Sequence, residues 1–328
     1  MMTVHPSAIS ILNTARRAYG WGKKLLNQHS APSLPAVDYS GQAASDVIRA
    51  KILTPEPCMI CRFGGVEMAA LMHHHSIQQK SQFWGQKSLA YIRGATRPFW
   101  WDDNIRKKMR YNAGFFPATP EYLERFCERM LADITIIDIL GSWLPEEQIL
   151  SNYLSQAIKV KLQDLEPYYH EEPWSEALEG KRVLVIHPFA ETIQQQYQQR
   201  ECLFQNPKIL PEFELKTLKS VQSIAGNECN FSDWFAALAW MVEQMSQIDF
   251  DVAIIGAGAY GLPLAAAVKR LGKKAIHLGG ATQILFGIRG KRWDDDPFFQ
   301  TLFNEHWRRP APTEVPGNFQ VVEGGCYW

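Results

Sequence analysis

Short apolar runs alternate with longer amphipathic stretches along most of the chain. Strand-sized apolar runs occupy residues 58–63, 134–140, 183–187, 251–255 and 275–278. Helices are expected where apolar side chains recur at helical spacing or where a polar stretch follows a strand. These segments are residues 66–72, residues 146–162, a segment ending at Tyr197, and residues 231–245. This alternation predicts an α/β, Rossmann-like fold, with a mostly parallel sheet and helices on both faces.

The N-terminal segment is basic. Its first 37 residues contain four bases, Arg16, Arg17, Lys23 and Lys24, and no acidic residue. Two interpretations stay open: a helix that docks on the protein body, or a peripheral contact with an anionic membrane surface. We expect residues 1–38 to form a basic helix and a linker. Residues 39–328 are expected to form a single Rossmann-like domain.

Composition supports a full hydrophobic core. Apolar residues make up 46% of the chain and charged residues 21%, which excludes a disordered chain. Because 34 Lys and Arg balance 34 Asp and Glu, no chain-wide surface for nucleic acid is expected. The apolar runs are far shorter than the roughly 20 residues of a bilayer span, and the chain begins without a secretory pattern. We therefore expect a cytoplasmic protein with reduced cysteines, in which Cys58 and Cys61 pack in a strand.

One glycine-rich turn stands between the strand predicted over residues 251–255 and a helix that is expected to end just before Gly272. Gly256, Gly258 and Gly261 form a G-x-G-x-x-G motif that also contains Tyr260. Such a turn lets the backbone approach a phosphate at a helix N-terminus. A dinucleotide site also needs an acid about 20 residues later, and residues 274–280 contain none. A nicotinamide cofactor, another nucleotide or phosphate ligand, and a purely structural turn all stay open.

A second glycine turn is followed by a cluster of bases. The turn ends at Gly280 and leads into a short helical stretch that contains Gln283. The bases Arg289, Lys291 and Arg292 follow this stretch. Such a cluster can neutralise a diphosphate, whose charge grows as it leaves. A solvated basic loop is the alternative.

The first predicted strand ends in a base and an acid. Arg62, Gly64 and Glu67 lie at its carboxyl edge, where open α/β sheets bind ligands. A carboxylate at this position can cap the following helix or act as general base for an attacking hydroxyl. His187 and His277 end two other predicted strands at the same edge. Each could be a site residue or a buried histidine with a structural role.

Aromatic residues are abundant, with eleven tryptophans. Trp84, Trp100 and Trp101 lie close to two arginines in the sequence, an arrangement that suits sugar stacking, an aromatic core or a partner surface. The aromatic C-terminal segment, residues 324–328, is expected to dock against the domain.

These stretches together resemble a known family. Arg62-Phe63-Gly64, followed three positions later by Glu67, is similar to the Arg-Phe-Gly-Asp-Gly-Glu signature of bacterial glycosyltransferases with the GT-D fold, a Rossmann-like architecture. Residues 251–261 and 279–293 are similar to the closing part of proteins with that fold, which sit in surface-polysaccharide clusters.

The signature implies a role for each matching position. In the family, its Asp-x-Glu serves metal-assisted transfer from a nucleotide sugar. Glu67 matches the Glu, whereas Gly65 stands in place of the Asp. The resemblance therefore leaves open whether Mn²⁺ or Mg²⁺ takes part. Without a metal, Arg62, Lys291 and Arg292 would have to offset the diphosphate charge.

The resemblance implies transfer of a sugar from a nucleoside diphosphate donor, with a UDP-sugar expected, to a surface-glycan or lipid-linked glycan acceptor. Glu67 would be the catalytic base and Arg62 a second catalytic residue. The expected donor-binding residues are Gly64, His187, Gly256, Gly258, Tyr260, Gly280, Gln283, Lys291 and Arg292. This requires Glu67 to share one cleft with Lys291 and Arg292. An NAD- or FAD-dependent oxidoreductase and a non-catalytic nucleotide- or glycan-binding protein stay open as alternatives.

Overall fold

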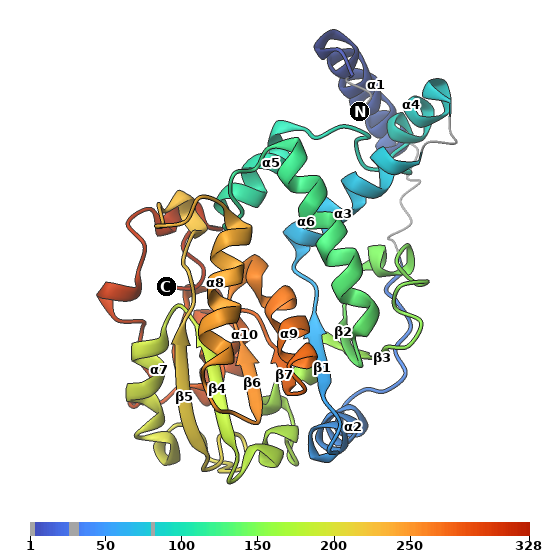
Figure 1. Ribbon diagram of the computed structural model, residues 1–328. Helices are drawn as coiled ribbons and strands as arrows, with labels where there is room; N and C mark the ends of the chain where they lie inside the picture. Colours follow the sequence, from blue (N-terminus) through green and yellow to red (C-terminus); the bar gives the residue numbers. More distant parts are fainter. Residues whose placement is uncertain (1–3, 26–32, 80–82) are drawn as a thin grey trace.

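The central element of the fold is a parallel sheet. The computed structural model describes residues 4–25, 33–79 and 83–328 (Figure 1). Within these residues seven strands form one sheet in the order β3-β2-β1-β7-β6-β4-β5, and every neighbouring pair is parallel. The strands are β1 Cys58–Arg62, β2 Ile139–Ser142, β3 Ile158–Lys161, β4 Arg182–His187, β5 Glu214–Lys219, β6 Val252–Ile255 and β7 Lys274–His277. The predicted parallel α/β architecture is confirmed.

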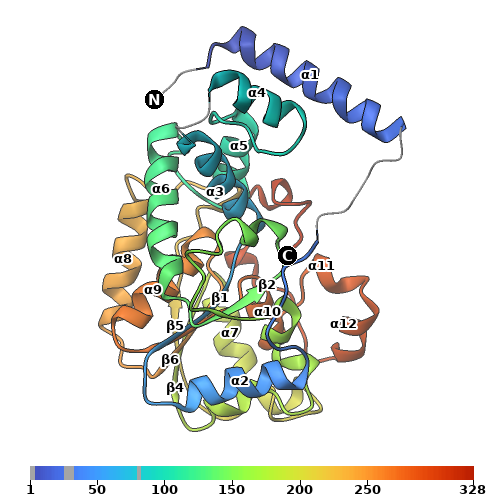
Figure 2. The same cartoon turned by 90° about the vertical axis from the view of Figure 1, so that its right-hand side faces the viewer.

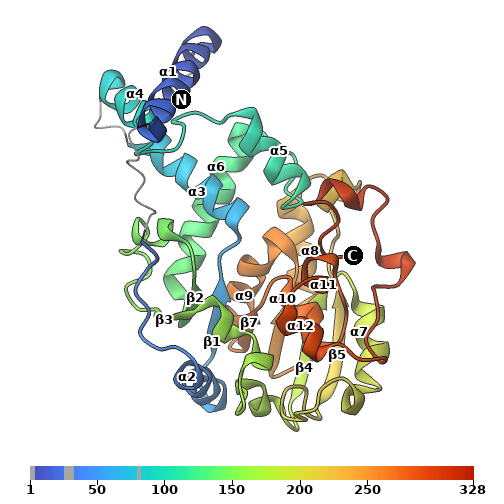
Figure 3. The ribbon, with the colours of Figure 1, turned by 180° about the vertical axis from the view of Figure 1, so that it is seen from behind.

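Helices cover both faces of this sheet. One face packs against α3 (Gly65–Gln78), α6 (Pro120–Asp133), α8 (Trp234–Ser246) and α9 (Gly261–Arg270). The opposite face, seen in Figure 3, packs against α2 (Gln42–Leu53), α7 (Ala190–Tyr197), α10 (Ala281–Leu285), α11 (Lys291–Asp294) and α12 (Pro297–Leu302). Along β1, Met59 and Cys61 join the first apolar cluster, whereas Cys58 and Ile60 join the second. Burial on both faces explains why this strand is a continuous apolar run in the sequence.

Three further helices lie beyond the sheet. They are α1 (Pro6–Leu25), α4 (Trp84–Ile92) and α5 (Asp103–Tyr111). The expected N-terminal helix is confirmed, and it packs on α4 at one end of the molecule (Figures 1 and 2). Part of the linker expected within residues 1–38 lies outside the described residues. Among the described helices, none combines the length and the apolarity needed to cross a membrane.

The prediction of a helix over residues 146–162 is wrong. The chain instead makes a short 3-10 turn at Pro145–Gln148, further turns, and the strand β3. The carboxylate of Glu147 accepts hydrogen bonds from the backbone N–H groups of Trp143 and Leu144, both at 3.0 Å, and from the hydroxyl of Ser142. These bonds tie the chain into a tight turn directly after β2, so that a helix does not form there.

Two other differences concern strands. The run predicted over residues 134–140 begins as a 3-10 turn at Ile134–Ile136, and β2 starts only at Ile139. Strand β5 was not expected, because it forms the edge of the sheet and alternates polar with apolar side chains. Edge strands lack the continuous apolar run of central strands, so the pattern is weak there.

The strand order brings the two halves of the chain together beside β1. The first three strands lie on one side of the boundary between β1 and β7, and the last four lie on the other. Open α/β sheets bind ligands outside the carboxyl ends of their strands at such a change in strand order. Helix α3 and the glycine turn after β6 both begin at this edge.

Candidate active site

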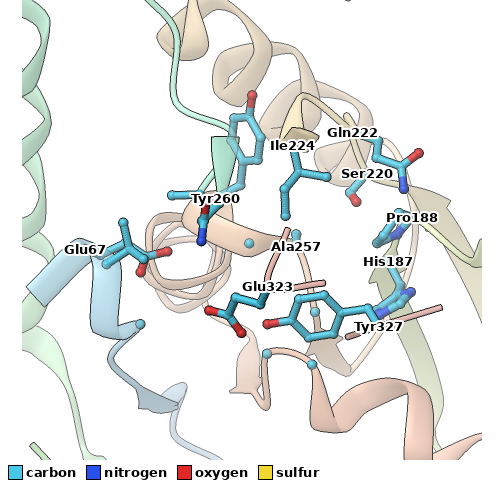
Figure 4. A pocket seen from close by; sticks show the side chains of 18 of the residues that line it. Glu67, His187, Pro188, Ser220, Gln222, Ile224, Ala257, Tyr260, Glu323 and Tyr327 are labelled. Atoms are coloured by element: carbon cyan, nitrogen blue, oxygen red, sulfur yellow. The ribbon is translucent and has the colours of Figure 1, made fainter. Parts of the chain in front are cut away.

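A cavity of about 380 Å³ opens at the carboxyl edge of the sheet (Figure 4). Its walls come from the loops after six of the strands, from the end of α5 with Lys108, from Arg292 of α11 and from the C-terminal segment 323–328, which closes one side. The predicted site residues that line it are Arg62, Gly64, Glu67, His187, Gly256, Gly258, Tyr260, Gly280, Gln283 and Arg292. In Figure 4, Glu67 lies at one end of the cavity and His187 at the other, with Glu323 and Tyr327 between them.

Glu67 occupies the first turn of α3 and is only 9% exposed. Its carboxylate folds back over Gly64, so closely that a Cβ on that glycine would overlap it. Burial raises the pKa of Glu67, and its own backbone N–H and the nearby Arg62 oppose part of this shift. A buried carboxylate with a raised pKa is a stronger base than an exposed one, which suits removal of a proton from a hydroxyl.

Arg62 is the last residue of β1 and one of three cationic residues that line the cavity, with Lys108 and Arg292. Its guanidinium lies over the ring of Trp143, 5.1 Å from the ring centre, and close to Gly279. Burial lowers the pKa of Arg62 from its usual value, but an arginine remains charged in proteins. Within the described residues its guanidinium makes no ion pair and no hydrogen bond. A half-buried guanidinium without an acceptor is well placed to bind an anion.

Trp143 was not predicted as a site residue. Its indole N–H donates to the carbonyl of Phe63 at 3.1 Å, and its backbone N–H is held by Glu147. The ring therefore has a fixed position beneath Arg62. No sequence motif marks this residue, because its role depends on a contact between the ends of β1 and β2.

The structure does not bring Lys291 to the cavity. Its side chain is exposed, with Nζ 3.4 Å from the carbonyl of Gly324. The backbone N–H groups of Lys291 and Arg292 donate to the carbonyls of Trp328 and Cys326, at 3.2 and 2.9 Å. The start of α11 is thus packed against the C-terminal segment, and only Arg292 lines the cavity.

Arg292 is already paired at the cavity wall. Its guanidinium forms an ion pair with Glu323 and lies 4.8 Å from the centre of the Tyr327 ring. The expected cationic cluster on the diphosphate is therefore reduced to the unpaired Arg62 and the paired Arg292.

The first glycine motif accommodates side chains of the protein itself. A Cβ at Gly256 would lie 2.6 Å from both the carbonyl oxygen of Gly279 and the His187 ring, and one at Gly261 would overlap the ring of His277. Gly258 has a positive φ of 52°, which favours glycine. Tight packing therefore explains the motif, whether or not a phosphate also approaches it.

The end of β7 bears on the dinucleotide interpretation. In dinucleotide folds an acid about 20 residues after the glycine turn holds the ribose hydroxyls. Strand β7 ends here at His277, followed by Leu278 and Gly279. The structure thus places no carboxylate at that position.

Two buried histidines stand at the edge of the sheet as neutral rings. His187, 3% exposed, accepts the backbone N–H of Phe189 at its Nδ1, so its proton resides on Nε2. Burial lowers the pKa of His187 to about 3. Burial and the nearby Arg62 lower the pKa of His277 to about 4, and its Nδ1 lies 3.2 Å from the carbonyl of Ile255. In the described structure the Nε2 of His187 has no partner, so it can donate a hydrogen bond to a ligand.

Tyr260 and Gln283 line the cavity, but their polar atoms are already bonded. The Tyr260 hydroxyl lies 3.0 Å from the hydroxyl of Ser223, and its ring stacks on Trp234. The amide nitrogen of Gln283 donates to the carbonyls of Ile288 and Tyr327, at 3.2 and 3.1 Å. Both residues shape the wall, and Gln283 also holds the C-terminal segment.

Docking of that segment is confirmed. Tyr327 packs against Gly280, where a Cβ would lie only 2.6 Å from its ring. Glu323, Tyr327 and Trp328 all line the cavity, which the sequence did not indicate. The aromatic character of the segment signalled docking but not its place.

The described residues do not fit a metal site formed by protein side chains alone. They include no group of three or more His, Cys, Asp and Glu side chains placed to hold a metal ion. Gly65 stands where the signature has its Asp, and Glu323 is engaged with Arg292.

Comparison with known proteins supports the same fold. A family model described as a GT-D fold-like domain matches residues 147–285. The matched stretch contains β3 to β7 and both glycine turns, but not β1 with Arg62 or the start of α3 with Glu67. No curated protein and no solved structure matches the chain. Together with the parallel sheet, the match supports a GT-D-like, glycosyltransferase-type fold.

Proposed function

With the GT-D-like fold as the premise, we propose that this chain is a glycosyltransferase. It takes a sugar from a nucleoside diphosphate donor, with UDP-sugars as the first donors to test, and delivers it to a hydroxyl of a surface-glycan or lipid-linked glycan acceptor. The observation that carries the proposal is that the Glu67 carboxylate and the unpaired Arg62 guanidinium line one cavity at the carboxyl edge. A cytoplasmic location is part of the proposal.

Donor binding rests on charge and on size. A cavity of about 380 Å³ falls within the usual range for small-molecule sites. Arg62 attracts the diphosphate, and the Nε2–H of His187 offers a neutral hydrogen bond at the opposite end from Glu67. In this arrangement the nucleotide lies toward His187 and the transferred sugar toward Glu67.

The transfer step uses Glu67 as base. The acceptor hydroxyl gives its proton to the Glu67 carboxylate, and its oxygen forms a bond to the anomeric carbon of the sugar. The bond from that carbon to the diphosphate oxygen breaks, and its electron pair leaves with the nucleoside diphosphate. Arg62 stabilises the charge that develops on this leaving group.

The first experiment is a donor-hydrolysis assay. Many transferases slowly release the nucleotide from their donor without an acceptor, so the purified chain is incubated with a panel of UDP- and GDP-sugars, which release a diphosphate, and CMP-sugars, which release a monophosphate. We expect release from one donor class, and strong loss of release in Arg62→Ala. Glu305→Gln, an exposed acid outside the cavity, is the control and should release at the wild-type rate.

The same panel separates the rival functions. An oxidoreductase would bind NADH or FAD and be stabilised by it against heat, with no response to nucleoside diphosphates. A non-catalytic binding protein would be stabilised by a nucleotide sugar without releasing product. The cavity favours the transferase because β7 ends without a ribose-binding acid while a buried carboxylate stands ready as base.

A further inference from the structure

A projection stands apart from the sheet at the far end of α3. It consists of residues 4–25 and 83–101, which we call the N-terminal projection (Figures 1 and 2). A small apolar cluster holds it together, built from Leu12, Tyr91, Phe99 and Trp100. This cluster is separate from the two that flank the sheet.

The charge of the projection has one sign. Its residues include four bases in the first segment and three in the second, and no Asp or Glu, although the whole chain is balanced. Three of the bases are bonded within the protein: Arg16 and Lys87 to backbone carbonyls, and Arg97 to Glu146. The remaining bases make no ion pair with any described residue: Arg17, Lys23, Lys24 and Arg93.

Large apolar side chains are exposed on the same projection. Ile11 is 70% exposed, Trp21 75% and Phe83 82%, and Trp84 and Leu89 are also exposed. A soluble surface rarely gathers so many large apolar groups without a binding partner.

Cations and apolar groups share one face of α1. Trp21 lies four residues after Arg17 and three before Lys24, so the three side chains are neighbours on the helix. An indole beside Lys and Arg suits a membrane interface, because tryptophan lies at the headgroup level and the long basic side chains can reach the anionic headgroups.

We propose that the N-terminal projection docks on an anionic phospholipid bilayer. Its unpaired cations are complementary to anionic headgroups, and its exposed indole, phenyl and aliphatic groups can enter the headgroup–acyl boundary. Aliphatic groups such as Ile11 and Leu89 have no use in stacking on nucleic-acid bases, which favours lipid over nucleic acid. With four bases, α1 lies on the surface and does not cross it.

The geometry links this surface to the candidate active site. Helix α3 begins beside the cavity, and the carbonyls of Ser76 and Ile77 near its end accept hydrogen bonds from Lys87 of α4. Its 14 residues span about 21 Å at 1.5 Å per residue. If the proposed function holds, this places the cavity within reach of a saccharide carried on a membrane lipid.

The test is a vesicle-flotation assay with the full chain. We expect the protein to float with vesicles in which about one lipid in three is phosphatidylglycerol, and to stay behind with pure phosphatidylcholine. Two double variants test the surface: Arg17→Glu with Lys24→Glu removes cations, and Trp21→Ser with Phe83→Ser removes apolar groups. Each is expected to lower the bound fraction about tenfold or more.

Matched variants away from the projection serve as controls. Lys161→Glu with Lys181→Glu changes charge as much, and Leu53→Ser removes an exposed apolar side chain. All of these variants change surface residues, and a melting curve for each shows that it folds. The controls are expected to float like the wild type.

Three results would overturn the proposal. The first is that the protein floats equally with neutral and anionic vesicles. The second is that the projection variants and the control variants lose the same fraction of bound protein. The third is that the protein does not float, but shifts duplex DNA on a gel in a way that depends on the projection. The last result would assign the surface to nucleic acid. Because the readout is lipid binding, none of them depends on whether the chain transfers sugars.

Discussion

Glu67 and Arg62 owe their chemical character to their immediate surroundings. The carboxylate is buried over Gly64, and burial raises its pKa. The guanidinium rests on Trp143 without an acceptor of its own. A base and an anion-binding group thus lie in one cavity without an ion pair between them, so both remain available to a ligand.

Substitution of Glu67 by Gln tests the base directly. The amide keeps the shape of the side chain but cannot take a proton, so transfer is expected to fall by about 10²- to 10⁴-fold. Donor affinity is expected to change little, because Arg62 is untouched. The measurement is the steady-state transfer rate with an identified donor and acceptor, and a variant with the full rate would remove Glu67 from the mechanism.

The pH dependence of stability tests whether the Glu67 carboxylate is buried in the folded protein. The pKa of Glu67 is raised in the folded protein, so the folded state holds this proton more tightly than the unfolded state. Its contribution to stability is complete below the unfolded pKa, about 4.5, and is lost as pH rises through the folded pKa. Glu67→Gln is therefore expected to melt higher than the wild type at pH 8, with the difference shrinking toward pH 4.5. A gap that does not vary with pH would contradict the burial of this carboxylate.

Gly64 tests the placement of the carboxylate. Its φ of −78° and ψ of 141° suit alanine, but an added Cβ would displace the Glu67 side chain. Gly64→Ala is expected to reduce transfer strongly while the melting temperature changes little. Gly65→Ala is the comparison, since its Cβ would meet Trp143 at an ordinary 3.5 Å. Similar rates in the two variants would show that the carboxylate position is unimportant.

At the scale of elements, the cavity depends on segments with little regular structure. The 3-10 turn after β2 fixes Trp143, and the C-terminal segment packs on Gly280 and α11. These segments hold the cavity walls by hydrogen bonds and ring packing.

Removal of the C-terminal segment should therefore destabilise the protein. Truncation after residue 322 exposes the surface covered by Tyr327 and Trp328 and leaves the amide of Gln283 with one partner fewer. The expected loss is about 2 kcal/mol or more, or roughly 5 °C in melting temperature. Tyr327→Phe, which keeps the ring, should retain most of this stability. An unchanged melting temperature after truncation would mean that the segment is not docked in solution.

The sequence predicted the central elements and missed those set by distant contacts. Strands β1, β4, β6 and β7 are buried on both faces, and their continuous apolar runs identified them. Edge strand β5 has no such run. Over residues 146–162 the apolar spacing predicted a helix, but the hydrogen bonds of the buried Glu147 carboxylate hold the chain in a turn there. Adjacent bases on a short helix point in different directions, so spacing could not decide which of Lys291 and Arg292 reaches the cavity.

At the scale of the whole molecule, the site joins residues from both ends of the chain. Glu67 and Arg62 come from the first part of the chain, whereas Tyr327 and Arg292 come from the last. The GT-D fold-like match over residues 147–285 covers the glycine turns between them. A ligand that bridges these walls should stabilise the whole fold, because it binds only when they are together.

That linkage predicts a thermal shift. A nucleoside diphosphate at about 100 times its dissociation constant adds about 2.7 kcal/mol of stability, which corresponds to several degrees in melting temperature. Arg62→Ala is expected to abolish the shift, and Lys291→Ala to leave it intact because that side chain lies outside the cavity. If Lys291→Ala removed the shift while Arg62→Ala kept it, the diphosphate would bind elsewhere.

A crystal structure of the chain soaked with UDP, in the presence and absence of Mn²⁺, would show whether Glu67 and Arg62 together form a donor site. We expect density in the cavity at the carboxyl edge, with diphosphate oxygens within hydrogen-bonding distance of the Arg62 guanidinium and the β-phosphate directed toward Glu67. Density at another surface, or a diphosphate bound out of reach of Arg62 with Glu67 facing away, would contradict this expectation.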